Sequence, residues 1–253
     1  MHKIENLENT IHCADCLEFM LNIPDKSVNM ILADLPYGTT NCKWDTIIPF
    51  EPLWKQYKRI IKDNGAIVLT ASQPFTSALV MSNIKMFKYC WYWEKERLTN
   101  ITQVKKRAGK TVEECAVFYN KQPTYIPQMV EYSGKKRTNK VKNGVMGKLI
   151  DNNTKKVVEY IDTGFRYPTQ VLKIQRDILK SNIHPTQKPV ALFEYLIKTY
   201  TSVGDLVLDN CMGSGTTGVA CKNLNRGFIG IEKELKYFEI AKNRINQTME
   251  SLF

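Results

Sequence analysis

The sequence predicts an α/β fold built on a mainly parallel sheet. Apolar runs that suit buried strands alternate along the chain with segments whose apolar residues recur at helical spacing. Two of the strand candidates end in a carboxylate, Asp34 and Glu232, and another ends in Asp209 directly before a glycine-rich turn. The alternation of strands and helices implies parallel strands whose carboxyl ends bind ligands.

Length and composition narrow the class of protein. The 253 residues fit one large α/β domain or two small ones, and 43% hydrophobic with 10% aromatic residues exclude global disorder. No apolar run approaches the ~20 residues of a membrane helix, and none follows residues 1–5. We therefore expect no membrane partner, no signal peptide and a cytoplasmic location.

The cysteines and histidines offer little material for a metal site. The seven cysteines are scattered, and the one CxxC, residues 13–16, has no second pair or histidine pair nearby. The chain holds only three histidines. We expect reduced cysteines and no bound metal.

The first third of the chain carries four strand or helix signals. The apolar residues 28–34 predict a buried strand. Residues 54–61 have helical spacing, with Trp54, Tyr57 and Ile61 on one face, and the turn residues 63–65 are expected to end that helix. Further strands are expected over residues 66–70, 87–93 and 115–119. Trp91 and Trp93 are expected to pack in the core rather than to contact a ligand.

The last quarter returns to the same alternation. A helix is expected after Pro189, which suits an early helix position, with apolar residues on one face up to Tyr200. Strands are expected over residues 205–209 and 228–232, and each is followed by a segment with helical spacing.

Positive charge is confined to one internal segment. Residues 95–180 carry 19 Lys and Arg against 8 Asp and Glu, a net charge of +11, so the rest of the chain is neutral overall. Turn residues crowd the second part of this segment, which predicts a loop-rich inserted region over residues 125–180, between residues 1–124 and 181–253. A polyanion such as nucleic acid is the expected partner. The expected contacts are Lys105, Lys106, Arg107, Lys135, Lys136, Arg137, Lys155 and Lys156.

A glycine-rich turn over residues 209–218 is the strongest ligand signal. Glycines between a strand and a helix let the backbone approach a ligand and open the helix N-terminus toward it. Residues 213–218 also fit GxGxxG, and Glu232 lies 19 residues after Gly213, where it is placed to accept ribose hydroxyls. A P-loop is disfavoured because no Lys-Ser/Thr pair follows. NAD and S-adenosylmethionine both remain open, although the 35 residues after Gly218 are too few for a second nucleotide-binding half and a catalytic domain.

A second motif, residues 34–38, ends the first buried strand. The Asp34 carboxylate and a neighbouring carbonyl can accept hydrogen bonds from an exocyclic amine, and the Tyr37 ring can stack on the base that carries it. By itself the motif also fits a plain tight turn. Together with the glycine-rich turn it becomes specific.

These motifs resemble those of the DNA amino-methyltransferases in the permuted β arrangement, where the catalytic motif precedes target recognition and the cofactor loop. Residues 34–37 resemble (Asp/Asn/Ser)-Pro-Pro-Tyr, and residues 209–217 resemble the Phe-x-Gly-x-Gly loop. Glu232 matches the acid that holds the cofactor ribose, and Asp15 the acid on the adenine side. Residues 184–189 are similar to His-Pro-Thr-x-Lys-Pro. The matches span residues 11–246, and the basic segment is the unmatched, variable part.

The resemblance implies a Rossmann-like methyltransferase fold, with helices on both faces of a twisted, mainly parallel sheet, and S-adenosylmethionine as cofactor. It assigns catalysis to Asp34, Leu35, Pro36 and Tyr37. Three interpretations of Lys188 remain open: it binds the cofactor carboxylate, it binds a phosphate, or it is an ordinary lysine on the surface. Leu35 replaces the usual first proline, and Cys211 stands where the family often has Phe. The implied cofactor contacts are Asp15, Cys16, Asp34, Lys188, Asp209, Met212, Gly213, Gly215, Thr216, Thr217 and Glu232.

The activity that the resemblance implies is methylation of a flipped adenine at N6 in double-stranded DNA. Asp at the first motif position is usual for adenine, whereas Ser is commoner for cytosine N4. The alternatives are cytosine N4, an amine of RNA or protein, a non-catalytic DNA-binding protein on this scaffold and, more distantly, an NAD-dependent oxidoreductase. The enzyme is either solitary or one half of a restriction pair with a separate endonuclease, and many members of this arrangement form homodimers. The sequence of residues 209–215 resembles that of enzymes carried by phages and mobile elements, so the resemblance implies the cytoplasm of a bacterial or phage-infected host cell.

Overall fold

The computed structural model describes residues 4–40, 42, 45–132, 148–150, 157–159, 164–177 and 187–250. The chain divides into two units. Unit 1 comprises residues 1–126 and 170–253, and unit 2 comprises residues 127–169. No helix among the described residues is long and apolar enough to cross a membrane.

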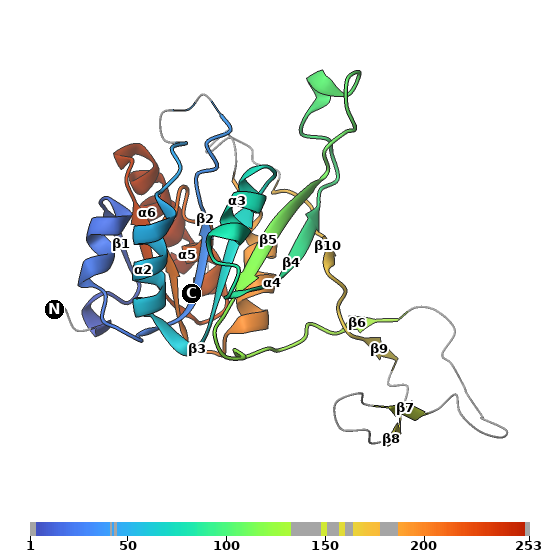
Figure 1. The fold of residues 1–253 in the computed structure, drawn as a ribbon. Helices are drawn as coiled ribbons and strands as arrows, with labels where there is room; N and C mark the ends of the chain where they lie inside the picture. The colour runs from blue at the N-terminus through green and yellow to red at the C-terminus, as the bar shows by residue number, and fades with distance from the viewer. Residues whose placement is uncertain are drawn as a thin grey trace. The chain divides into compact units, whose positions relative to one another are not determined.

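Unit 1 is built on an eight-stranded sheet with the strand order β1-β12-β11-β2-β3-β5-β4-β10 (Figure 1). All neighbouring strands are parallel except the pairs β3/β5 and β5/β4, which are antiparallel. The strands are β1 (Thr10–Cys13), β2 (Val28–Asp34), β3 (Ile61–Ala71), β4 (Phe87–Glu94), β5 (Val112–Phe118), β10 (Val171–Lys173), β11 (Leu206–Asp209) and β12 (Gly227–Glu232).

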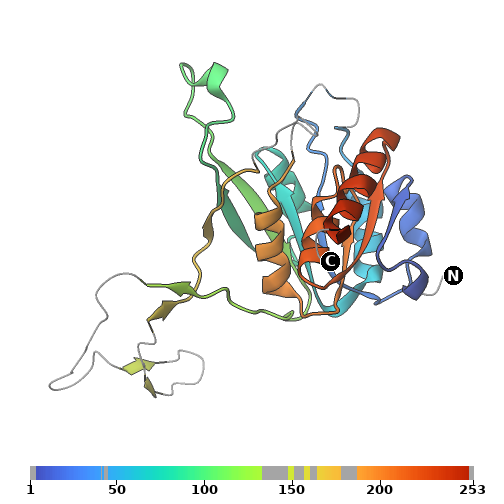
Figure 2. The same cartoon turned by 180° about the vertical axis from the view of Figure 1, so that it is seen from behind.

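Helices cover both faces of this sheet, which confirms the predicted fold class. Figure 1 shows α2 and α3 on one face, and Figure 2 shows α4 and α6 on the other. The two apolar clusters follow this division, since α1, α2 and α3 contribute to one and α4, α5 and α6 to the other. The helices are α1 (Cys16–Phe19), α2 (Phe50–Ile60), α3 (Phe75–Ser82), α4 (Val190–Tyr200), α5 (Thr216–Asn223) and α6 (Leu235–Glu250), and short 3-10 turns are η1 (Ile4–Asn6), η2 (Met20–Asn22) and η3 (Ile101–Gln103).

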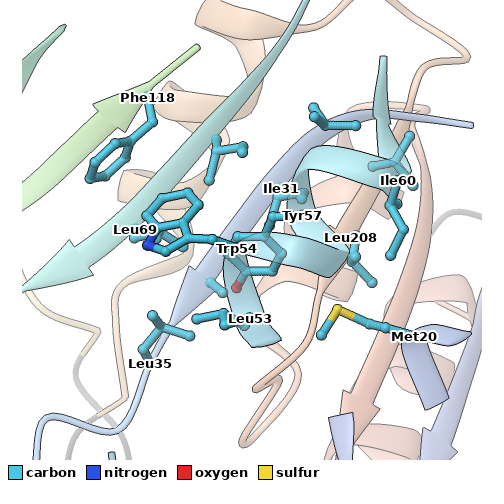
Figure 3. Packing of buried hydrophobic residues seen from close by; sticks show 14 of the residues in the cluster. Met20, Ile31, Leu35, Leu53, Trp54, Tyr57, Ile60, Leu69, Phe118 and Leu208 are labelled. Atoms are coloured by element: carbon cyan, nitrogen blue, oxygen red, sulfur yellow. The ribbon is translucent and has the colours of Figure 1, made fainter. Parts of the chain in front are cut away.

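The central strand β2 shows why the sequence folds this way. Its residues are apolar on both sides, so Ile31 packs in the cluster under α2 while Met30 and Leu32 pack in the cluster under α4. Figure 3 shows Trp54 and Tyr57 of α2 packed on the first of these clusters. Burial of both sides fixes β2 in the middle of the sheet and thereby fixes where its carboxyl end lies.

The helix α2 ends earlier than the sequence predicts. We expected turn residues 63–65 to end it, but the helix stops at Ile60 and Ile61 already pairs with Val28 in the sheet. The register between β2 and β3 then jumps, so that Met30 pairs with Ala66. The turn residues therefore form an irregularity within β3, because pairing of Ile61 draws the chain into the sheet. The expected core positions of Trp91 and Trp93 are confirmed.

One extension of the chain leaves the sheet at the edge where residues 34–37 lie. Because β4 is antiparallel to β5 and β5 to β3, β4 runs in the same direction as β2. Residues 95–111, which we call the arm, therefore leave the sheet at the edge where β2 ends. Figure 1 shows the arm in green, extending away from β4 and β5.

Unit 2 consists of two small antiparallel pairs. β6 (Val130–Glu131) pairs with β9 (Phe165–Arg166), and β7 (Lys148–Ile150) pairs with β8 (Val157–Glu159). The Arg166 guanidinium lies 4.3 Å from the centroid of the Tyr132 ring. Residues 170–177 belong to unit 1, because β10 pairs with β4. We had expected them to be part of the inserted region over residues 125–180.

Candidate active site

The carboxyl ends of four neighbouring parallel strands surround one cavity of about 350 Å³. Asp15 follows β1, whereas Asp34, Asp209 and Glu232 are the last residues of β2, β11 and β12. The wall also contains these predicted residues and their neighbours, among others: Cys16, Leu35, Pro36, Tyr37, Gln187, Lys188, Met212, Gly213, Ser214 and Thr216. Four acidic side chains at one end of a sheet make this cavity suited to a ligand that carries positive charge.

The two oxygens of Asp34 are occupied unequally. Oδ1 lies 2.7 Å from the Tyr37 hydroxyl and 2.8 Å from Lys188 Nζ, and it also accepts a hydrogen bond from the Thr70 hydroxyl. Oδ2 accepts a hydrogen bond only from Lys188, at 2.7 Å, among the residues that the structure describes. Oδ1 is thus saturated, and Oδ2 retains room for a further donor.

Lys188 is buried, with 6% of its side chain exposed. The interpretation of Lys188 as an ordinary surface lysine is therefore wrong. Its ammonium group contacts both oxygens of Asp34 and lies 3.5 Å from Glu113 Oε2. Burial alone lowers the pKa of Lys188, but the carboxylates of Asp34 and Glu113 outweigh it and raise that pKa above its ordinary value. Lys188 is therefore a cation held against Asp34.

Tyr37 and Leu35 are positioned by the first apolar cluster. The Tyr37 ring stacks on Phe75 with centroids 5.1 Å apart, and the Lys188 ammonium lies 5.4 Å from its centroid. Burial and the charges of Asp34 and Glu113 raise the pKa of the Tyr37 hydroxyl well above its ordinary value, so it stays protonated and donates. Leu35, in place of the usual proline, is 3% exposed and packs in the core.

The glycine-rich turn is held by Asp209. Oδ1 of Asp209 accepts the Cys211 N–H at 3.0 Å, and Oδ2 accepts the Thr217 hydroxyl. Burial raises the pKa of Asp209 to about 7 in spite of these hydrogen bonds. Gly215 has a φ of +83°, and a Cβ there would come within 3.0 Å of the Ala241 backbone in α6. Only glycine fits this position.

Glu232 and Asp15 are fixed by backbone amides. Glu232 accepts the N–H groups of Gly213 and Glu234, both at 2.8 Å, and burial raises its pKa. Asp15 accepts the Leu17 N–H at 3.0 Å at the start of α1 and forms an ion pair with Lys233. Burial opposes this ionisation, but Lys233 and the amide lower the pKa of Asp15 overall.

The segment before α4 is joined to the glycine-rich turn. Gln187 Oε1 accepts the Ser214 hydroxyl at 3.0 Å, and the Lys188 carbonyl lies 3.4 Å from the Thr216 hydroxyl. Arg244 of α6 donates to the carbonyl and hydroxyl of Ser214. These contacts fix the backbone that carries Lys188 relative to the turn.

The structure brings most of the predicted site residues together. Gly215 and Thr217 do not line the cavity but support the turn from behind. Lys105, Lys106 and Arg107 are exposed on the arm. The other predicted DNA contacts, Lys135, Lys136, Arg137, Lys155 and Lys156, lie outside the described residues.

Sequence reasoning missed several residues that hold the site. Thr70 and Phe75 position Asp34 and Tyr37, and Glu113 contacts Lys188. Asp45 accepts the N–H groups of residues 38–40 and so fixes the turn after the catalytic motif. Only Thr70 has a sequence signal, as the polar residue that ends the strand expected over residues 66–70.

Comparison with known proteins identifies the family of this chain. The family model described as DNA methylase, covering N6 and N4 methyltransferases, matches residues 28–243. The chain belongs to the DNA methylase family. It is 30% identical to the Type II methyltransferase M2.DpnII of Streptococcus pneumoniae, over 94% of this chain and 90% of that protein. It is 28% identical to M2.MboI of Moraxella bovis, over 94% and 87%.

Solved structures of similar proteins have the same fold as this DNA methylase. The M1.HpyAVI–SAM complex has a TM-score of 0.63 and 28% identity, covering 94% of this chain and 98% of that one. The cytosine-N4-specific PvuII DNA methyltransferase has a TM-score of 0.65 at 16% identity, covering 96% and 92%, and shows the fold alone.

The cavity of this DNA methylase fits S-adenosylmethionine, the cofactor of such enzymes. Its volume lies within the usual range for small-ligand sites. The cofactor carries a cationic sulfonium, an amino group and ribose hydroxyls, and the acids at the four strand ends are acceptors for such groups. Asp15, Asp209 and Glu232 are the residues that would hold it. The protein is an S-adenosylmethionine-dependent DNA methyltransferase.

Proposed function

We propose that this DNA methyltransferase methylates the exocyclic N6 of adenine at a specific sequence in double-stranded DNA. The observation that carries the proposal is the state of Asp34, whose Oδ2 accepts only the Lys188 ammonium among the described residues and lines the cavity beside the glycine-rich turn. The choice of adenine over cytosine is supported by Asp at the first position of residues 34–37.

The residues around Asp34 suit the activation of an amine. Asp34 Oδ2 and the Leu35 carbonyl accept the two N–H groups of the target amine, which leaves the nitrogen lone pair directed into the cavity. S-adenosylmethionine, when bound, supplies a methyl group on a positively charged sulfur. The N–C bond forms as the S–C bond breaks, the sulfur keeps the electron pair, and one proton leaves the nitrogen. The contribution of the protein is mainly one of position.

Access to Asp34 requires the target base to leave the duplex. Asp34 is partly buried, with 25% of its side chain exposed, at the end of a sheet strand. A base that remains stacked in DNA cannot reach such a group, so we propose base flipping. Tyr37 is the proposed aromatic partner of the flipped base, and Phe75 holds its ring in place.

Two parts of the chain are proposed to contact DNA. The arm carries Lys105, Lys106 and Arg107 in unit 1, at the catalytic edge of the sheet, and such cations bind phosphates. Target recognition is proposed for the inserted region predicted over residues 125–180, within which the structure separates residues 127–169 as unit 2. A homodimer, a separate cognate endonuclease and a cytoplasmic location are part of the same proposal and rest on the family resemblance.

The test is incubation with methyl-labelled S-adenosylmethionine and unmethylated genomic DNA, followed by digestion to nucleosides. We expect label in N6-methyladenine, lost in Asp34→Ala and kept in Asp63→Ala, an exposed acid that pairs with Lys26. Label in N4-methylcytosine would overturn the target base. Cofactor binding without label in DNA would point to RNA or protein, and lack of cofactor binding to a non-catalytic scaffold.

A further inference from the structure

A row of four charges, three of them on side chains no more than 16% exposed, runs from Asp34 along the edge of the sheet. Asp34 is paired with Lys188, Lys188 lies 3.5 Å from Glu113 Oε2, and Glu113 Oε1 is paired with Lys95. The side chains of Lys95 and Lys188 are 4% and 6% exposed, and that of Glu113 is 16% exposed. Glu113 and Lys95 belong to none of the motifs that the family resemblance supplies.

All the acids of this row face the same side of the sheet. Side chains alternate along a strand, and Met30 and Leu32 of β2 pack under α4, so Asp34 points to the same side. On β5, Cys115 and Val117 pack in that cluster, which places Glu113 on the α4 side as well. Lys188 directly precedes α4 and lies between the two carboxylates.

Stability alone does not account for these charges. Ions buried in a sheet lose their hydration, and well-packed apolar residues in their place are often as stable or more so. Moreover, Glu113 Oε2 is buried without a hydrogen-bond partner among the described residues, although it lies 3.5 Å from Lys188 Nζ. An acceptor left in this state attracts the ammonium without fixing it.

The arrangement matters for Asp34 because the Lys188 ammonium contacts both of its oxygens, so the target amine has to share an oxygen with that ammonium. Oδ1 already accepts from Tyr37, Thr70 and Lys188, so the amine needs Oδ2, which in the described part of the chain accepts only from Lys188. A second carboxylate on the far side of Lys188 shares the charge of the ammonium, so that Asp34 is not fully neutralised and its Oδ2 can still accept a further hydrogen bond. Lys95 in turn anchors that second carboxylate.

We propose that Glu113 is a positioning residue for methyl transfer, which shares the charge of the Lys188 ammonium and holds it beside Asp34, so that Asp34 stays oriented and its Oδ2 can also accept the target amine. The inference rests on the proposed role of Asp34 as the acceptor of that amine. Glu113 need not touch DNA or cofactor, because it acts through Lys188.

The charge state of Lys188 supports this role. Burial lowers its pKa, and Asp34 and then Glu113 raise it again, so that it stays charged. The other titratable groups around it are Cys115 on β5, Tyr37 after β2, and Lys95 after β4, whose own pKa burial lowers. Loss of the Glu113 charge lowers the pKa of Lys188, which moves the basic limb of the transfer rate to lower pH.

The test compares Glu113→Gln with Glu114→Gln in single-turnover methylation of sheared genomic DNA. Glu114 is the next residue on β5, faces α3 on the other side of the sheet and lies 3.3 Å from the Thr76 hydroxyl. We expect Glu113→Gln to transfer about 10- to 100-fold more slowly, with cofactor affinity unchanged and the basic limb displaced. Glu114→Gln is expected to keep the rate of the unaltered enzyme.

A second variant distinguishes a positioning role of Glu113 from an effect of Glu113 on the stability of the fold. Glu113→Gln leaves Lys95 buried without its partner, so its melting temperature is expected to fall. Glu113→Gln with Lys95→Met removes the unpaired charge and should restore the melting temperature but not the rate, while Glu113→Asp should recover part of the rate. An unchanged rate in folded Glu113→Gln, or recovery of the rate in the double variant, would overturn the inference.

The same assay distinguishes this inference from the proposed function. Unaltered enzyme that labels no adenine, or Asp34→Ala that labels it normally, would overturn the function and the inference together. Labelling that depends on Asp34 but not on Glu113 would overturn the inference alone.

Discussion

Replacement of Lys188 by methionine tests the ion pair at the centre of the site. Methionine keeps much of the volume of the lysine stem but removes the ammonium that contacts Asp34 at 2.7 and 2.8 Å. The change leaves the carboxylates of Asp34 and Glu113 on opposite sides of an apolar side chain.

The structure sets the size of the expected effect. Unit charges at this separation attract by about 6 kcal/mol at an effective dielectric constant of about 20, and desolvation of the ammonium offsets part of that. Loss of one partner of a buried pair typically costs about 3–5 kcal/mol. Because Asp34 is 25% exposed, water can replace some of the lost hydrogen bonds, so we expect the free energy of unfolding to fall by about 3 kcal/mol.

The assay is thermal unfolding without cofactor, followed by circular dichroism, with Lys198→Met as the control on the exposed side of α4. For a chain of this length, about 3 kcal/mol corresponds to a melting temperature about 6–12 °C lower. Methyl transfer is expected to slow by about 100-fold, since Asp34 loses its orientation. A melting temperature within about 2 °C of that of the control would refute the assignment of Lys188 to a buried, stabilising pair.

Two further predictions concern the glycine-rich turn and the arm. Burial raises the pKa of Asp209 from 3.8 to about 7, so the folded state keeps a proton that the unfolded chain releases, and stability should fall as pH rises from about 4 to 7. The slope is at most about 1.4 kcal/mol per pH unit, and urea unfolding of Asp209→Asn across that range should lack this decline. On the arm, a triple change to Gln should weaken binding to labelled duplex DNA and make the slope of log K against log salt shallower by about 2–3, measured by anisotropy. A triple change on exposed lysines away from the arm should leave that slope unaltered. The arm variant changes Lys105, Lys106 and Arg107, and the control changes Lys55, Lys58 and Lys85.

The sequence predicts the frame of the site well because strand ends are local features. An apolar run that stops at Asp34, and others that stop at Asp209 and Glu232, fix three carboxylates at one edge as soon as the strands are parallel. The short strand β1 escapes prediction, since three of its four residues are half-buried, the fourth is exposed, and the strand lacks an apolar run. Its position beside β12 places Asp15 at the same edge.

What the sequence does not predict is which side chains meet across that edge. Glu113 and Glu114 are adjacent and chemically alike, yet they face opposite sides of the sheet. The register of the antiparallel strand β5 decides which of them lies beside Lys188, and a shift of one residue would exchange them. Register arises from packing on both faces, so no local pattern in residues 112–118 contains it.

Leu35 illustrates how the catalytic motif and the core are joined. A proline at this position would fix the backbone through its ring, whereas Leu35 is held by burial in the cluster that also contains Leu53 and Phe75. Phe75 in turn stacks on Tyr37, which donates to Asp34. The rigidity that the ring would supply therefore comes from packing, and the carbonyl proposed to accept the target amine depends on the α2 and α3 side of the core. Asp34 itself depends on the opposite side, through Lys188 and Glu113. The acceptor pair of the reaction is thus positioned from both faces of the sheet, which explains why a site of this precision lies at the end of a central strand.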